Sequence, residues 1–239
     1  MSTTRVVKLR ILDKGPDSVF LFRDFLDLPV QAVAKSLSRL AKSGLIKRVR
    51  KGMYYYPKPT LLGPSYPKQS EIIDKALKKT DETHVFSAGG TGFQNLGLTT
   101  QVPHSYTIVS NQPAKQMAFG KMHVKIYRRS GRYLKDATQK DVWILDSLRN
   151  IKHIPDTMPD VAIGKIVHTL ESSKPSLKRL IKISHEEPPR VRALLGAIAE
   201  HLGYCSPDVD ALKKTLNPTT KYHLGLGACL PTGRHWNVE

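Results

Sequence analysis

The sequence predicts an α+β protein with two domains, on three observations. In the first sixty residues, apolar positions alternate between helical spacing and short runs of period two. A proline-rich stretch at residues 56–67 then breaks this pattern with four prolines and one glycine. From residue 137 onward, helical spacing dominates. We therefore expect an N-terminal domain at residues 1–60 and a mixed C-terminal domain at residues 61–239, with a small sheet and a helical bundle.

The chain is strongly basic, and the charge is concentrated near its start. It has 239 residues and a formal net charge of +18. Residues 1–60 hold thirteen Lys and Arg against four acids, a net charge of +9. This imbalance predicts a polyanionic partner such as nucleic acid. No run approaches the roughly 20 apolar residues of a membrane span, and we expect a cytoplasmic protein that does not bind membranes.

The first domain begins with an expected helix at residues 5–14, which Thr3 or Thr4 would cap. A short strand at residues 18–21 follows, and then one or two helical turns at residues 23–28. The next helix spans residues 30–43, where apolar residues recur at intervals of three and four. Pro29 suits its first turn, and Gly44 suits the left-handed position that ends a helix.

The helix at residues 30–43 combines an apolar face with a face of hydrogen-bond donors. The apolar face includes Val33, Leu37 and Leu40. The opposite face carries no acid, and its members are Gln31, Lys35, Ser38, Arg39 and Lys42. Donors of this kind, presented on one helix, are suited to reading base edges in the major groove of duplex DNA.

After Gly44 the period changes to two, which predicts a β-hairpin with Gly52 at its tip. Four cations belong to this hairpin: Lys47, Arg48, Arg50 and Lys51. Helix, strand, helical turn, helix and hairpin follow one another as in a winged helix-turn-helix domain. In that fold the third helix enters the major groove. We expect the four hairpin cations to contact DNA phosphates.

The C-terminal domain is predicted to begin with a helix at residues 70–80. The glycines of residues 84–103 lack the spacing and the Lys-Ser/Thr pair of a phosphate-binding loop, so we expect a turn into a short helix at residues 93–98. A strand and a hairpin are expected next, then five helices, and the last 20 residues should fold back as irregular or extended chain. The expected strand covers 106–110, the hairpin 115–128, and the helices 137–151, 158–172, 176–184, 188–202 and 207–216.

The predicted hairpin of the C-terminal domain is also basic, through Lys115, Lys121, Lys125, Arg128 and Arg129. Alternation in its second strand places Lys121, His123, Lys125 and Tyr127 on one side and Met122, Val124 and Ile126 on the other. Two interpretations remain open. The face is either simply solvated, or it contacts nucleic acid or an acidic partner.

Nothing in the sequence predicts catalysis. The nine histidines form no His-x-x-x-His or His-Glu-x-x-His pair. Cys205 and Cys229 are too few for a disulfide framework or a four-cysteine zinc site. We expect no catalytic residue, no metal and no cofactor.

Several short motifs resemble the AbiEi-like antitoxins of type IV toxin–antitoxin systems. The N-terminal ones are Val-Phe at 19–20, Arg-Asp-Phe-Leu-Asp-Leu at 23–28, Leu-Ser-Arg-Leu at 37–40 and Lys-Gly-Met-Tyr-Tyr at 51–55. Later ones are Asn-Leu-Gly-Leu-Thr-Thr-Gln-Val-Pro at 95–103, Val-Arg-Ala-Leu-Leu-Gly at 191–196 and the closing Leu-Asn-Pro to Trp-Asn segment. One departure is that Leu21 or Phe22 stands where the family usually has a Ser or Thr helix cap.

The resemblance implies a winged helix that represses the toxin–antitoxin operon, and a C-terminal domain that counteracts a nucleotidyltransferase-like toxin. Neutralisation could act on the toxin itself or on its RNA target. Two alternatives remain. One is a stand-alone winged-helix transcriptional regulator whose C-terminal domain senses a ligand or dimerises. The other is a nuclease or RNA-modifying enzyme, which would need a basic C-terminal groove.

Overall fold

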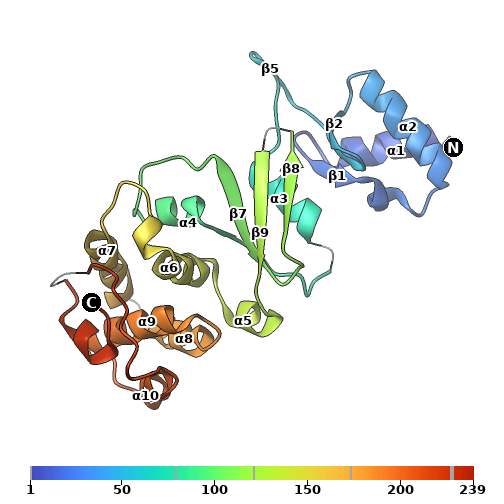
Figure 1. The fold of residues 1–239 in the computed structure, drawn as a ribbon. Helices are drawn as coiled ribbons and strands as arrows, with labels where there is room; N and C mark the ends of the chain where they lie inside the picture. The colour runs from blue at the N-terminus through green and yellow to red at the C-terminus, as the bar shows by residue number, and fades with distance from the viewer. Residues whose placement is uncertain (1, 79, 121, 173, 227–228) are drawn as a thin grey trace. The chain divides into compact units, whose positions relative to one another are not determined.

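A computed structural model describes residues 2–78, 80–120, 122–172, 174–226 and 229–239 and shows a mixed α+β fold with three small sheets (Figure 1). The chain forms two compact units. The first comprises residues 1–83 with 118–121, and the second comprises 84–117 with 122–239. None of the helices in the described residues combines the length and the apolar character that a bilayer crossing requires.

The elements follow one another in this order. Residues up to 83 form α1 (Thr3–Asp13), β1 (Val19–Leu21), the 3-10 helix η1 (Phe22–Phe25), α2 (Val30–Lys42), β2 (Lys47–Arg50), β3 (Met53–Tyr55), β4 (Pro59–Thr60), β5 (Gly63–Pro64) and α3 (Gln69–Leu77). The strands that follow are β6 (Val85–Ala88), β7 (Ser105–Ser110), β8 (Lys115–Phe119) and β9 (Met122–Arg128). The later helices are α4 (Gly90–Asn95), α5 (Gly131–Asp136), α6 (Gln139–Arg149), η2 (Ile151–His153), α7 (Pro159–Glu171), α8 (Lys174–Ser184), α9 (Pro189–His201), α10 (Pro207–Lys214) and η3 (Pro231–Trp236).

The N-terminal elements match the predicted ones in type and order. β1, β3 and β2 form one antiparallel sheet in that order. The β2–β3 hairpin turns at Gly52, whose φ of 77° favours glycine. Gly44, with φ of 79°, follows α2 in the same left-handed region and ends it as predicted. The cap of α1 differs, because Ser2 accepts the N–H of Arg5 in place of Thr3 or Thr4.

An apolar core holds α1 and α2 together with η1 and the strand β1. Val7 and Ile11 of α1 are fully buried, and they share one cluster with Val33 and Leu37 of α2 and with Phe20 of β1. The apolar face predicted for the helix at residues 30–43 is confirmed at Val33, Leu37 and Leu40. Val30 and Ala34, which the same prediction placed on that face, are exposed. Burial of this face fixes the opposite, polar face of α2 toward solvent.

The proline-rich stretch at residues 56–67, whose prolines favour extended chain, contains a paired element. β4 and β5 pair as a short antiparallel ribbon, with Thr60 Oγ1 donating to the carbonyl of Gly63 at 2.6 Å. Proline permits this because a two-residue strand needs few backbone donors. Leu61 and Leu62 at the ribbon tip are fully exposed.

The first compact unit extends beyond residue 60, where the sequence places a domain boundary. α3 packs on β1, and its Glu71 accepts the N–H of Val19 at 2.9 Å. Ile72 and Leu77 of α3 are buried. These contacts tie α3 to the elements before the proline-rich stretch, so the unit reaches residue 83.

A four-stranded sheet has the order β6-β7-β9-β8 and lies in the second unit except for Ala118 and Phe119 at the end of β8, which belong to the first. β6 pairs antiparallel with β7, and β7 pairs parallel with β9. The sequence predicts β7, β8 and β9 but not β6, and it predicts α6 but not α5. The sequence analysis places a turn at glycines 89, 90 and 92 and a helix at residues 93–98. In the structure β6 directly precedes these glycines, and α4 already begins at Gly90.

Helices and the C-terminal segment complete the core of the second unit. α4 and α6 pack against β6 and β7, and α6 in turn contacts α8 and α9. The predicted return of the last residues is confirmed, because Leu224, Leu226, Leu230 and Trp236 are buried in the same core. These residues form loops and η3, with a single bridge between Tyr222 and Val238.

Trp236 lies against Gly196 of α9, and this packing should be sensitive to one methyl group. A Cβ at Gly196 would lie 2.3 Å from the indole ring, whereas a Cβ at Gly164 of α7 would meet no atom within 4 Å. Gly196→Ala should lower the free energy of unfolding by about 1–3 kcal/mol through overpacking. The matched Gly164→Ala should raise it by about 0.5–1 kcal/mol. Chemical denaturation measures both, and equal stability of wild type and Gly196→Ala would contradict the packing.

Candidate nucleic-acid interface

The structure brings the predicted helix residues together on one solvent-facing side of α2. Gln31, Lys35, Ser38, Arg39 and Lys42 are all exposed. Within the described residues, none of the three cations among them has an ion-pair partner. Their hydrogen-bond donors are therefore available to an external partner.

Internal contacts fix the rotation of α2 about its axis. Ser36 is buried, donates to the carbonyl of Ala32 at 2.7 Å and lies 2.8 Å from Thr4 Oγ1 of α1. Ser36 was not among the predicted donors, and its position on the buried side explains why. The polar contact to α1 and the apolar contacts of Val33 and Leu37 hold the donor face in one orientation.

No acid occurs between Asp27 and Glu71, a segment of the chain that holds nine Lys and Arg. Asp27 itself is paired, because Arg10 donates to both of its carboxylate oxygens at 2.8 and 2.6 Å. Glu71 is engaged by the backbone of Val19. The charge of α2 and of the following hairpin thus has no acid in its own segment to offset it, which favours a polyanion.

Three of the four predicted hairpin cations are exposed: Lys47, Arg48 and Lys51. Arg48 directs its Nε toward the carbonyl of Arg50 at 3.3 Å, which orients its guanidinium along the hairpin. Arg50 differs from the prediction in its surroundings. It is half-buried, and its guanidinium lies 5.0 Å from the ring centroid of Phe119, which belongs to the same compact unit.

A second candidate site lies in the second unit, beside the basic hairpin that the sequence analysis names as a candidate surface. A cavity of about 400 Å³ opens between α4, the strands β7 and β9, and the end of α6. Its polar walls include Tyr127 and Arg129 from the basic hairpin. From α6 and η2 come residues at positions i, i+3, i+4 and i+7: Asp146, Arg149, Asn150 and His153. That helical spacing of polar residues is the sequence signal for this site.

Two carboxylates lie in or beside the cavity, the half-buried Asp146 and the buried Glu187. Asp146 accepts the N–H of Gly89 at 2.8 Å and the amide of Asn150 at 3.2 Å. Burial raises the pKa of the Asp146 carboxyl, and these hydrogen bonds only partly oppose the rise. Glu187, whose side chain is 1% exposed, forms an ion pair with Arg149. Burial also raises the pKa of the Glu187 carboxyl. Perturbed acids in a cleft are typical of binding sites.

The basic hairpin itself divides between the cavity and the solvent. Met122, Val124 and Ile126 are buried while His123, Lys125 and Tyr127 are exposed, so the predicted alternation is confirmed for the described strand. Arg129 lines the cavity. Lys115, Lys125 and Arg128 are exposed, and Lys121 lies outside the described residues.

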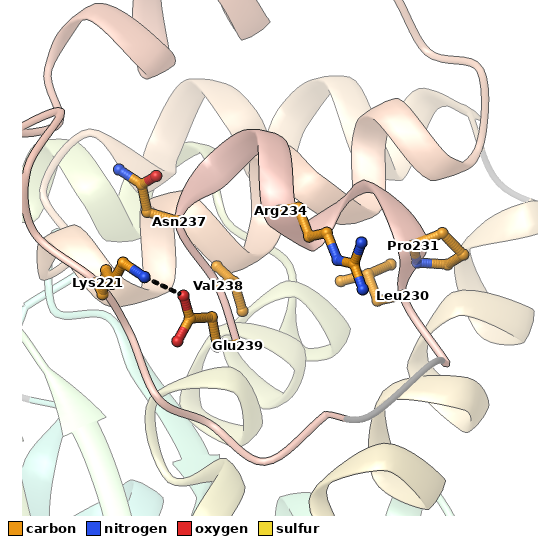
Figure 2. Close-up of a pocket in the computed structure, with 7 residues that line it drawn as sticks. All are labelled: Lys221, Leu230, Pro231, Arg234, Asn237, Val238 and Glu239. Atoms are coloured by element: carbon orange, nitrogen blue, oxygen red, sulfur yellow. Dashed lines mark hydrogen bonds and ion pairs between the residues drawn. The ribbon is translucent and has the colours of Figure 1, made fainter.

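A larger hollow of about 940 Å³ lies against the C-terminal segment (Figure 2). Its carboxylate, Glu239, is already paired with Lys221 at 2.8 Å and with His223 at 3.1 Å. Among the described residues, no group of three or more His, Cys, Asp or Glu is arranged to hold a metal ion. We therefore place the candidate sites on α2 with its hairpin and in the smaller cavity.

Comparison with protein families assigns most of the chain. Residues 6–177 match the family described as "Family of unknown function (DUF6088)". The chain belongs to DUF6088. A comparison with curated proteins finds no match.

One solved structure similar to this DUF6088 protein is the crystal structure of the Rv2827c protein from Mycobacterium tuberculosis. The TM-score is 0.56 at 13% sequence identity, and the alignment covers 98% of this chain and 89% of that one. At this identity the match shows a shared fold, and the mixed α+β class is thereby confirmed.

The raised pKa of Asp146 predicts a pH-dependent stability difference. A carboxyl whose pKa is raised by folding stabilises the protein below its ordinary pKa of about 3.9 and loses that contribution as the pH rises through the folded value. Asp146→Asn should therefore gain stability relative to wild type between pH 4 and pH 7. The gain should be about 1.4 kcal/mol for each unit by which the pKa is raised. Denaturant titrations at several pH values measure it.

Asp136→Asn is the matched control because its shift has the opposite sign. The hydrogen bond from Lys182 lowers the pKa of the Asp136 carboxyl. Its contribution is present above the ordinary pKa and disappears on acidification, so Asp136→Asn should become slightly less stable relative to wild type over the same range. A pH-independent difference for Asp146→Asn would contradict the half-buried position of this acid.

Proposed function

We propose that this protein is a DNA-binding antitoxin that represses its own toxin–antitoxin operon and counteracts a nucleotidyltransferase-like toxin. The observation that carries the DNA-binding part is the acid-free donor face of α2 beside a basic hairpin. The order α1, β1, η1, α2, β2 and β3, with the sheet order β1-β3-β2, supports a winged helix-turn-helix domain.

In this proposal α2 is the recognition helix. Arg39 and Lys35 would bond to guanine O6 and N7, and Gln31 to adenine. Ser38 and Lys42 lie on the same exposed face and would complete the interface with the bases. The third helical element of a helix-turn-helix domain enters the major groove with its exposed face toward the bases, and α2 is third after α1 and η1.

The β2–β3 hairpin would act as the wing. Lys47, Arg48 and Lys51 are exposed cations that would contact phosphates, while Arg50 would stabilise the hairpin by packing on Phe119. Phosphate contacts add affinity and position the protein without reading sequence. In this proposal α2 contacts the bases, and the hairpin neutralises phosphate charge.

The antitoxin part of the proposal rests on the resemblance to AbiEi-like proteins, which extends along the chain. The second unit would carry this activity, acting on the toxin or on its RNA target. Its exposed basic residues Lys115, Lys125 and Arg128 are a surface to which an acidic partner would be attracted.

A stand-alone winged-helix regulator is the second candidate, and the cavity of the second unit favours it. A regulator that senses a small molecule needs a pocket of this size with convergent polar groups. The neighbouring genes separate the two candidates, because an adjacent nucleotidyltransferase gene supports the antitoxin and its absence supports the regulator.

Arg39→Ala should weaken binding of the full chain to its operator by about 1–3 kcal/mol and relax base preference at one position. The reason is that alanine cannot make the bidentate hydrogen bonds of a guanidinium to a base. Gel-shift titration against an operator series, with each base varied in turn, measures both effects. Unchanged affinity and preference would contradict recognition by α2.

The double variant Arg48→Ala, Lys51→Ala provides a matched contrast. It should leave base preference intact but reduce the steepness of log K against log[salt] by about 0.9 for each phosphate that the variant no longer neutralises. Lys8→Ala, at an exposed lysine of α1, should change neither quantity. A wing variant with the wild-type salt slope would remove the hairpin from the interface.

The antitoxin activity should be separable from DNA binding. A full-length chain with Lys35→Ala and Arg39→Ala should fail to repress an operator–reporter fusion. The same chain should restore growth as well as wild type when the toxin is expressed from an independent promoter. Loss of both activities in a variant of wild-type stability would show that neutralisation depends on the α2 face.

A further inference from the structure

We propose that the cavity between α4, β7, β9 and the end of α6 binds a nucleoside monophosphate. This inference does not depend on DNA binding by the first unit. It rests on the size of the cavity, on two arginines in its wall and on an exposed aromatic ring at its edge. The cavity volume of about 400 Å³ falls in the range of about 300–1,000 Å³ that small-molecule pockets occupy.

The architecture of the sheet aims side chains from two strands into this cavity. β7 and β9 are parallel, and Val109 is directly paired with Tyr127. Val109 packs in the core that includes α6, so Tyr127 lies on the same face of the sheet. Thr107, two residues earlier, lines the cavity from that face as well. The cavity is therefore built on regular elements.

Arg129 and Arg149 supply the groups that would hold a phosphate. Arg149 pairs with Glu187 through Nη2, yet its Nε is buried and has no hydrogen-bond partner in the described part of the chain. Arg129 donates from Nη1 to the carbonyl of Arg128 at 2.8 Å and has no ion-pair partner among the described residues. A guanidinium has five N–H donors, and its planar fork matches a phosphate. Because this Nε has no accessible surface, a phosphate in the cavity would reach the other N–H groups of the two guanidiniums.

The two acids of the site already have partners within the protein. Glu187 is occupied by Arg149, and Asp146 is turned toward the N–H of Gly89 and the amide of Asn150. Arg129 has no such pair, although its charge acts on the carboxyl groups of both Asp146 and Glu187. A phosphate in the cavity would accept hydrogen bonds from the Arg129 guanidinium.

The remaining walls suit a planar base. The ring of Tyr127 is 49% exposed at the cavity, and the buried Phe93 contributes apolar surface. A base would stack on Tyr127, an interaction that tolerates any base. The Asn150 amide nitrogen already donates to Asp146, so Asn150 and Asp146 would offer a base edge their side-chain oxygens as acceptors. Inorganic phosphate alone would use only part of this site.

Isothermal titration of the full chain with AMP, GMP, CMP and UMP, and with inorganic phosphate, tests the proposal. At least one nucleotide should bind with a stoichiometry of one and at least tenfold more tightly than phosphate. A tetranucleotide with a terminal phosphate separates a free mononucleotide from the end of a nucleic acid chain, because the two offer the same chemistry. Tighter binding of the tetranucleotide would assign the site to a chain end.

Three variants assign the site. Arg129→Gln should weaken nucleotide binding by about tenfold or more, since it removes a charge-assisted hydrogen bond to the phosphate. Tyr127→Ala should weaken nucleotide binding but leave phosphate binding unchanged. Arg128→Gln is the matched control, because Arg128 is the exposed neighbour outside the cavity wall, and it should change affinity by less than about twofold.

Three results would overturn the proposal. The first is the absence of heat for every nucleotide and for phosphate with folded wild-type protein. The second is an equal loss of affinity in Arg128→Gln and Arg129→Gln, which would indicate diffuse attraction by a basic surface. If Arg129→Gln proves unfolded by circular dichroism, Tyr127→Ala decides alone, and equal loss of nucleotide and phosphate affinity in that variant would also overturn the proposal.

Discussion

The packing of the second unit depends on three carboxylates that are wholly or partly removed from water and must therefore accept hydrogen bonds or form ion pairs. Asp141 near the start of α6 is fully buried, and its carboxylate accepts a hydrogen bond from Nε of Arg179 in α8 at 2.5 Å. Asp146, about one and a half helical turns later, accepts a hydrogen bond from the N–H of Gly89 between β6 and α4. Glu187, just before α9, pairs with the last residue of α6. Removal of the arginine from either buried ion pair would leave an uncompensated charge and destabilise the fold by about 3–5 kcal/mol. Asp141 and Glu187 therefore tie α6 to α8 and to the segment before α9.

In the first unit the dominant electrostatic feature is repulsion among many exposed cations. Its core is apolar, with Phe20, Phe25 and Leu37 buried, and its cations are left on the outer faces of α2 and the hairpin. With no acid between Asp27 and Glu71, mutual repulsion among these cations is relieved only by solvent and salt. A surface with that property gains most when it meets a polyanion, because binding releases counterions and removes the repulsion together.

Prediction from the sequence succeeded where local pattern decides the structure. The donor face of α2, the stops at Gly44 and Gly52 and the alternation along β9 all follow from periodicity and from the conformational freedom of glycine. Prediction failed where distant contacts decide. β6 contains only four residues and becomes a strand because β7 pairs with it. The ribbon at Pro59–Pro64 forms in a stretch whose composition predicts no strand pairing. Arg50 packs on the ring of Phe119, which is distant in sequence. The sequence analysis names Tyr127 and Arg129 of the cavity wall but not the cavity, because the other wall residues come from elements far apart in sequence.

The strand order of the sheet in the second unit has a consequence for how the chain acquires its fold. β9 is the last of the four strands in sequence, yet it lies between β7 and β8. β7 therefore keeps one open edge until β9 docks beside it, and parallel pairing cannot be made through a tight turn. Such non-local pairing is slow compared with helix formation. An unpaired strand edge is a template for strands of other molecules, and the pairing of β9 closes this edge of β7.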